Sequence, residues 1–235
     1  FVSRRNCDQL MISVAYAKQN VKIIGSDPGI NAETNGGTHM PFEDIGVLRS
    51  IPTIVIVEVA DPEQLRQAVP AMIRHNGPVY LRMARKEQPA VFDSSYHFDL
   101  FKADLLREGS DVTILATGLL LSRALEAAEL LENEGIRAEV INVHTIKPLD
   151  QETILASVKK TGCVVTAENH NVIGGLYSAV SELLAANQPA PIERVGIEDE
   201  FGEVGNLAAL SKRYHLNAED IVNKAKFAVG TKEKE

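Results

Sequence analysis

Short apolar runs alternate with helical patterns along the first ninety residues of the chain. The runs are dense in Val and Ile and predict strands at residues 21–25, 53–59 and 79–83. Apolar positions at helical spacing predict helices at residues 7–19, 41–49 and 62–75. Asp61 would cap the last of these, with Pro62 at its first position. Buried strands that alternate with helices are typical of a parallel sheet covered on both faces, so residues 1–88 are expected to form one α/β unit.

A second alternating segment follows a connector with turn and aromatic residues, which we place at residues 89–107. Strands are expected at 112–117, 137–143, 163–167 and 192–195, and helices at 122–133, 151–160, after Gly174-Gly175 and at 217–229. Residues 168–173 are expected to form a loop. The pattern therefore predicts a second, smaller α/β domain over residues 108–230.

The chain opens at Phe1 and runs almost at once into the first helical pattern. A domain seldom starts inside an element that needs a partner. We therefore expect the first α/β unit to be incomplete, with its remainder missing or supplied by another chain.

Composition narrows the class of protein. A net charge of −8 and the lack of a basic cluster argue against nonspecific nucleic-acid binding. No apolar run approaches the length that spans a bilayer, and no leader pattern is present. Cys7 and Cys163 stand in no metal or redox spacing, and the histidines show no metal-ligand spacing. We expect a cytoplasmic protein with no nucleic-acid partner, no membrane partner and no metal ligands of its own.

The candidate chemistry begins in residues 25–49, which read GSDPGINAETNGGTHMPFEDIGVLR after a predicted strand. Ligands of open α/β sheets bind beyond the carboxyl ends of the strands. His39 lies in this segment, beside a helix expected to begin at Pro41, whose free N–H groups would attract an anion. Spacing alone leaves open a solvated loop with an incidental histidine.

Arg85 lies just past the strand predicted at 79–83, at the same edge of the sheet. Strand alternation places Arg82 and Arg85 on different faces, so that one is expected in a salt bridge and the other in the crevice.

Glu168, Asn169 and His170 stand at another strand end, where an interface is favoured over catalysis. Thr117-Gly118 lacks the G-x-G-x-x-G pattern, which favours a tight turn over a dinucleotide site.

Several of these segments resemble the transketolase family. GSDPGINAETNGGTH resembles the family loop that ends in D-G-x-T-H, and PFEDIGVLRSIP resembles the helix after it. FVSRRNCDQ resembles the start of an aromatic-containing helix. INVHTIKPLD and TAENHNVIGGLYSAV resemble segments shared by transketolases, deoxyxylulose-phosphate synthases and 2-oxo-acid dehydrogenase β chains. The resemblance implies the second half of the thiamine-diphosphate-fold pyrimidine domain, followed by the transketolase C-terminal domain.

The resemblance also implies roles for five residues. Phe1 matches the aromatic residue that stacks on the aminopyrimidine of thiamine diphosphate, and His39 matches the histidine of the substrate channel. An imidazole, which can both accept and donate a proton, suits proton exchange with sugar oxygens. Arg85 matches the arginine that binds the sugar phosphate. Two positions depart from the family pattern: Asp27 replaces a second histidine, and Asn35 replaces the aspartate that reads a substrate hydroxyl. We expect both to bind substrate and to alter the choice of sugar.

As a whole, the resemblance implies transfer of a two-carbon ketol unit between phosphorylated sugars, as in pentose phosphate metabolism. The family holds the diphosphate of thiamine diphosphate and Mg²⁺ in a separate domain whose G-D-G…N motif does not occur here. We therefore expect activity only with an N-terminal section or subunit, in a homodimer or heterotetramer. Two alternatives remain open: a 2-oxo-acid dehydrogenase β chain or deoxyxylulose-phosphate synthase relative, and a noncatalytic binding or assembly module of the same fold.

Overall fold

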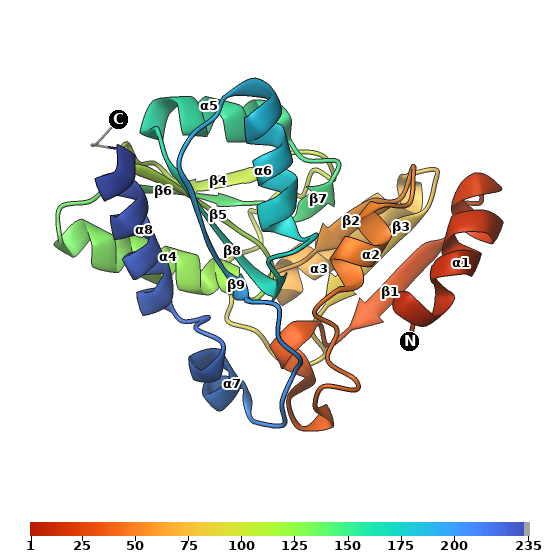
Figure 1. The fold of residues 1–235 in the computed structure, drawn as a ribbon. Coiled ribbons are helices and arrows are strands. Elements are labelled where there is room, and N and C mark those ends of the chain that lie inside the picture. Colours follow the sequence, from red (N-terminus) through yellow and green to blue (C-terminus); the bar gives the residue numbers. More distant parts are fainter. Residues whose placement is uncertain (233–235) are drawn as a thin grey trace.

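Our computed structural model describes residues 1–232 of the chain. These residues form two β-sheets, each covered by helices (Figure 1). The first sheet has the strand order β1-β3-β2-β7 and the second the order β4-β6-β5-β8-β9. Parallel pairs predominate in both sheets. The α/β class predicted for the two halves of the chain is therefore confirmed.

The first sheet is built around three parallel strands, β1 (Lys22–Ser26), β3 (Val79–Met83) and β2 (Val55–Glu58). One face packs against α2 (Asp44–Arg49) and an N-terminal helix, which comprises a 3-10 turn (Arg4–Asn6), α1 (Cys7–Gln9) and a π-helical stretch (Leu10–Tyr16). The other face packs against α3 (Pro62–Arg74). Asp61 caps α3 as predicted, its carboxylate accepting a bond from the Gln64 amide at 2.8 Å.

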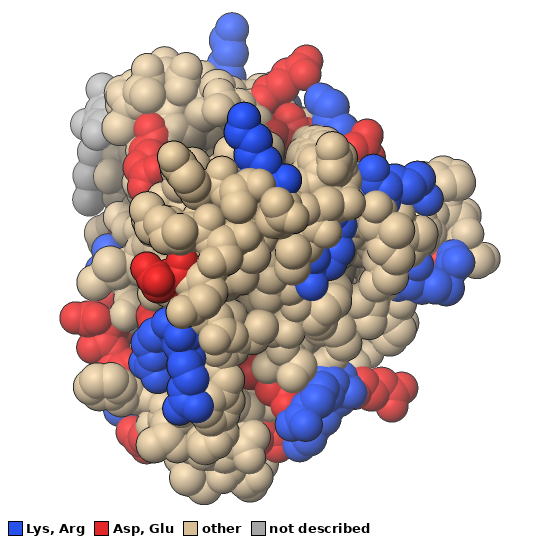
Figure 2. Space-filling model, turned by 90° about the vertical axis from the view of Figure 1, so that its right-hand side faces the viewer, with Lys and Arg blue, Asp and Glu red and all other residues tan. Residues whose placement is uncertain are grey.

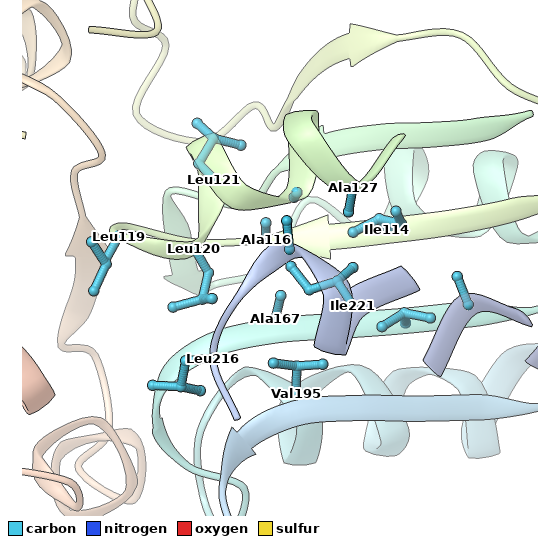
Figure 3. Close-up of a cluster of buried hydrophobic side chains, with 14 of the residues drawn as sticks. Ile114, Ala116, Leu119, Leu120, Leu121, Ala127, Ala167, Val195, Leu216 and Ile221 are labelled. Carbon is cyan, nitrogen blue, oxygen red and sulfur yellow. The ribbon is translucent and has the colours of Figure 1, made fainter. Parts of the chain in front are cut away.

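The second sheet has a large apolar core on each face. Its strands are β4 (Asp104–Arg107), β5 (Val112–Ala116), β6 (Ala138–Asn142), β8 (Val164–Asn171) and β9 (Ile192–Ile197). One face packs against α4 (Leu120–Asn133) and α8 (Ala218–Lys232), where side chains such as Ile114, Leu120, Val195 and Ile221 interdigitate (Figure 3). The other face packs against α5 (Gln151–Thr161) and α6 (Leu176–Asn187).

The two halves of the chain are joined by the connector and also by a strand of the second half that pairs with the first sheet. After β6 the chain crosses over, and β7 (Thr145–Lys147) pairs antiparallel with β2 at the edge of the first sheet. Lys147 then donates hydrogen bonds to the carbonyl oxygens of Arg49 (2.7 Å) and Ile51 (2.5 Å) at the end of α2. The C-terminal half of the chain therefore completes the first sheet.

Several elements differ from the sequence prediction. The expected loop at 168–173 is largely strand, because β8 continues to Asn171. β4 lies in the expected connector, and α7 (Leu207–Arg213) lies in a stretch given no element. The Gly-rich segment contains a 3-10 stretch (Gly29–Asn35), and α2 starts at Asp44 instead of Pro41. Short elements of this kind carry too few periodic positions to be recognised from spacing.

The N-terminal helix and Phe1, which precedes it, leave large apolar side chains exposed. Phe1 is 67% exposed and Tyr16 82%, and Met11 and Ile12 are about half exposed. Figure 2 views the molecule from the side of this helix and shows broad uncharged areas between separate Lys and Arg side chains. Within residues 1–232, no helix is both long and apolar enough to cross a membrane.

Candidate active site

A cleft of about 680 Å³ opens beyond the carboxyl ends of β1 and β3. Its walls come from the first five residues, from residues 24–27 and 35–43, and from Tyr80 and Arg85. All five site residues predicted from the sequence line it: Phe1, Asp27, Asn35, His39 and Arg85. The convergence follows from the sheet, because β1 and β3 are adjacent parallel strands and Ser26 pairs with Met83 at their ends. Residues that follow these two strands must therefore emerge side by side.

Asp27 and Arg85 form an ion pair at one end of the cleft. The Asp27 carboxylate accepts hydrogen bonds from the Arg85 side chain and, at 3.0 Å, from the Arg85 backbone N–H. The Asp27 side chain is nearly buried at 10% exposure, whereas the Arg85 side chain is 65% exposed. Asp27 therefore orients the arginine while leaving much of the guanidinium open to a ligand.

His39 lies on an exposed turn of the cleft wall. Its Nδ1 is 2.8 Å from the Thr38 hydroxyl, and its ring meets the edge of the Phe1 ring at a centroid distance of 5.3 Å. Within residues 1–232, no hydrogen bond forms at its Nε2. The histidine is thus held by two neighbours, with one ring nitrogen available to a substrate.

Positive charge predominates in the cleft. Three arginines line it, Arg4, Arg5 and Arg85, together with two carboxylates, Asp27 and Glu43. Both carboxylates are paired with arginines, Glu43 with Arg4 at 2.8 Å. Arg5 instead lies over the Phe1 ring, 4.3 Å from its centroid. In a chain of net charge −8, this local excess favours an anionic ligand.

The helix that was expected beside His39 carries an acidic residue in its first turn, which disfavours an anion there. α2 has only six residues, and its first turn carries Asp44, which is buried at 1% exposure. The Asp44 carboxylate accepts bonds from Arg82 Nε (2.9 Å) and from the Tyr80 hydroxyl (2.7 Å). The start of this helix is therefore occupied by a carboxylate of the chain itself.

Arg82 is the salt-bridging arginine that strand alternation predicted, and it is fully buried. Besides Asp44, it binds the Glu58 carboxylate through Nη1 at 2.5 Å. Burial works to raise the pKa of Asp44, but the Arg82 guanidinium, together with His170 and the Tyr80 hydroxyl, outweighs it and holds that pKa below its usual value. For Glu58, burial prevails over Arg82 and the pKa is raised. One arginine thus supports two carboxylates beneath the cleft.

Glu168, Asn169 and His170 are buried where β8 meets the first half of the chain. Glu168 accepts hydrogen bonds from the backbone N–H groups of Leu176 (2.6 Å) and Tyr177 (2.8 Å) at the start of α6, while burial raises its pKa to about 8. Burial lowers the pKa of His170 to about 4, so this imidazole is neutral near pH 7. His170 also contacts the first half of the chain, because its Nε2 accepts a hydrogen bond from the Gly46 amide at 3.3 Å, in line with the interface favoured from the sequence.

The sequence prediction missed the residues that complete the cleft, namely Arg4, Arg5 and Glu43. The adjacent pair Arg4-Arg5 was a usable signal, because it lies within one helical turn of Phe1, the aromatic residue expected at the cofactor, and adds positive charge there. Glu43 carried no such signal, since its role depends on contact with Arg4 across the cleft.

Family models match nearly the whole chain. The model of the transketolase pyrimidine binding domain matches residues 1–90, and that of the transketolase C-terminal domain matches residues 101–221. The chain belongs to the transketolase family. The resemblance seen in the sequence motifs is therefore confirmed, together with the fold that it implied.

Individual relatives cover almost all of this chain. The 6-deoxy-6-sulfo-D-fructose transketolase subunit of Clostridium sp. (strain MSTE9) is 54% identical over 225 residues, which make up 96% of this chain and 70% of the relative. An apulose-4-phosphate transketolase subunit of Phocaeicola vulgatus is 36% identical over 96% of this chain and 72% of its own length. A solved split gene transketolase, described as an inactive beta4 tetramer, superimposes with a TM-score of 0.89 at 39% identity, over 97% of this chain and 73% of the other.

Proposed function

We propose that this chain is the C-terminal subunit of a thiamine-diphosphate-dependent transketolase, which transfers a two-carbon ketol unit between sugars that carry a terminal phosphate or sulfonate. The observation that carries the proposal is the convergence of His39 and Arg85 in one positively charged cleft of a transketolase-family chain. Phosphate and sulfonate share a tetrahedral arrangement of anionic oxygens, which an arginine fork can bind with two hydrogen bonds.

Phe1 and Ile24 fit the ring of the cofactor. Both line the cleft, and their side chains are 67% and 48% exposed, so a flat heterocycle could bury apolar surface against them. When bound, thiamine diphosphate supplies the nucleophilic carbon that accepts the two-carbon unit. Within residues 1–232, no group of three or more His, Cys, Asp or Glu side chains is arranged to hold a metal ion. We propose that the diphosphate and Mg²⁺ are held by a partner subunit.

We assign proton exchange, binding of the anionic group and recognition of a hydroxyl to separate residues of this chain. His39 exchanges a proton with the sugar oxygen whose charge changes as the C–C bond is cleaved or formed, because its Nε2 makes no other hydrogen bond in the described chain. Arg85 binds the phosphate or sulfonate, and Asp27 orients it. Asn35 reads a sugar hydroxyl, with an amide that can both donate and accept.

An N-terminal transketolase subunit is the partner that this assignment requires. The exposed apolar side chains of the N-terminal helix, beside the cleft, support an assembly in which another subunit covers this face. Relatives described as transketolase subunits support the same arrangement.

The test is reconstitution with an N-terminal transketolase subunit, thiamine diphosphate and Mg²⁺. Donors would be 6-deoxy-6-sulfo-D-fructose, fructose 6-phosphate and unsubstituted fructose, with an aldose phosphate as acceptor. We expect a product two carbons longer than the acceptor, formed from the anionic donors and poorly from fructose. Release of CO₂ from pyruvate would instead support the deoxyxylulose-phosphate synthase or 2-oxo-acid dehydrogenase alternative. Turnover of no donor would support the noncatalytic module.

A further inference from the structure

The C-terminal half of the chain contacts the segment that follows β1, which carries several residues of the cleft. Asn169 makes two hydrogen bonds in this contact. Its side chain is fully buried in β8. The Asn169 Oδ1 accepts a hydrogen bond from the Ile30 amide at 2.9 Å, and its Nδ2 donates one to the Pro28 carbonyl at 3.0 Å. A single side-chain amide therefore makes two hydrogen bonds to a turn that lies about 140 residues away in sequence, and the turn is also tied by the backbone bonds Gly29 N–H to Pro41 O and Asn31 N–H to Pro28 O, each 3.1 Å.

Gly29 shows how closely this turn approaches the amide. It adopts a positive φ of 54°, and a Cβ added there would lie 2.1 Å from the Asn169 Oδ1. Only glycine meets both conditions. The turn therefore packs directly against the Asn169 amide, with no room for a side chain between them.

The same turn fixes the ion pair of the cleft. Pro28 directly follows Asp27, whose own amide donates to the Met83 carbonyl at 2.9 Å. Asp27 is therefore held on one side by β3 and on the other by the Pro28 carbonyl that Asn169 binds. Its carboxylate then holds both the backbone and the guanidinium of Arg85.

We infer that Asn169 is a positioning residue of the anion site: through the turn at residues 28–30 it places Asp27, and Asp27 presents Arg85 to the charged end of the substrate. The inference rests on the proposed function for the identity of the ligand. It assigns the C-terminal domain a part in substrate specificity, although this domain, as far as Lys232, contributes no side chain to the cleft wall.

The test compares two buried asparagines in the reconstituted complex. Asn169→Leu removes both bonds to the turn. Asn142→Leu is the matched control, because Asn142 is also fully buried in the second sheet but donates to Asp104, within its own half of the chain. Asn169→Asp keeps the size of the side chain and an acceptor for Ile30 but loses the donor to Pro28.

Both Asn169 variants are expected to raise KM for the phosphorylated or sulfonated donor by about tenfold, within the range that an ångström of misplacement can cost. KM for fructose should change less than twofold, and kcat for the anionic donor less than threefold. Asn142→Leu should leave all three values near those of the unmodified chain. Equal effects of Asn169→Asp on charged and uncharged donors, or no effect on either, would overturn the inference.

A second readout does not depend on activity. Hydrogen exchange of the Ile30 and Arg85 amides reports the turn and the Asp27 contact directly, because these amides bind Asn169 and Asp27. We expect Asn169→Leu to speed exchange at both by at least tenfold, and Asn142→Leu at neither. Unchanged exchange at Arg85 would overturn the inference even if transketolase activity is found. Faster exchange in a complex without activity would support the positioning while refuting the proposed function.

Discussion

Arg82 and Arg85 offer a matched pair for testing how burial decides the strength of an ion pair. Both bind carboxylates, but the Arg82 side chain is fully buried, whereas that of Arg85 is 65% exposed. Arg82→Met would break the contacts of Arg82 to Asp44, Glu58 and the carbonyl oxygens of Pro41 and Asn169. Two carboxylates would then be buried without a cation.

Breaking a buried ion pair by removing one partner costs about 3–5 kcal/mol of unfolding free energy. With two carboxylates left behind, we expect Arg82→Met at the upper end of that range near pH 8. Arg85→Met should change the unfolding free energy much less, since the guanidinium is 65% exposed and the Arg85 backbone N–H would still bind the Asp27 carboxylate. Urea unfolding of the purified chain, followed by circular dichroism, measures both.

The pH dependence sharpens this prediction. Without Arg82, burial raises the pKa of Asp44 and Glu58 above their unfolded values, so the folded variant binds protons more readily than the unfolded chain. Its stability should therefore fall as pH rises, and the deficit should be larger at pH 8 than at pH 5. Equal losses for the two arginine variants, or a deficit that grows at low pH, would refute the reasoning.

Three further predictions concern separate sites. Burial raises the pKa of Asp104 to about 6, so wild-type stability should fall as pH rises from about 4 to 6; urea unfolding of Asp104→Asn should lack that component. Asn35→Asp should change the ratio of kcat/KM values between donors epimeric at one hydroxyl, because a carboxylate cannot donate a hydrogen bond; an unchanged ratio would remove Asn35 from substrate reading. The isolated chain should bind thiamine diphosphate weakly by calorimetry, since we assign the diphosphate and Mg²⁺ to a partner, and micromolar affinity would contradict that assignment.

The site could be predicted largely because it follows from strand ends. Residues after two adjacent parallel strands converge in any such sheet, so Asp27 and Arg85 could be placed together before their contact was known. Strand alternation likewise predicted different surroundings for Arg82 and Arg85, although only the structure shows that Arg82 is the buried one. The family resemblance added His39, Asn35 and Phe1, whose roles stay predictions, as do the domain boundaries at residues 88 and 108.

Contacts between the two halves could not be predicted from local pattern. β7 joins the first sheet although it lies well inside the second α/β segment, and no periodicity records which sheet a three-residue strand will join. The two hydrogen bonds of the Asn169 side chain join it to a backbone turn about 140 residues away in sequence. Asp44 was expected in a helix, but its ion pair with Arg82 could not be predicted, because the two residues meet only when α2 packs on the first sheet.

The central claim is that His39 serves the chemical step while Arg85 binds the charged end of the sugar, in one cleft. The most direct test is steady-state kinetics of His39→Ala and Arg85→Ala in the reconstituted complex, with anionic and uncharged donors. We predict that His39→Ala lowers kcat by about a hundredfold with little change in KM. Arg85→Ala should raise KM about tenfold for phosphorylated or sulfonated donors and leave fructose unaffected. If Arg85→Ala weakened charged and uncharged donors equally, or if His39→Ala left kcat unchanged, the account of this cleft would be wrong.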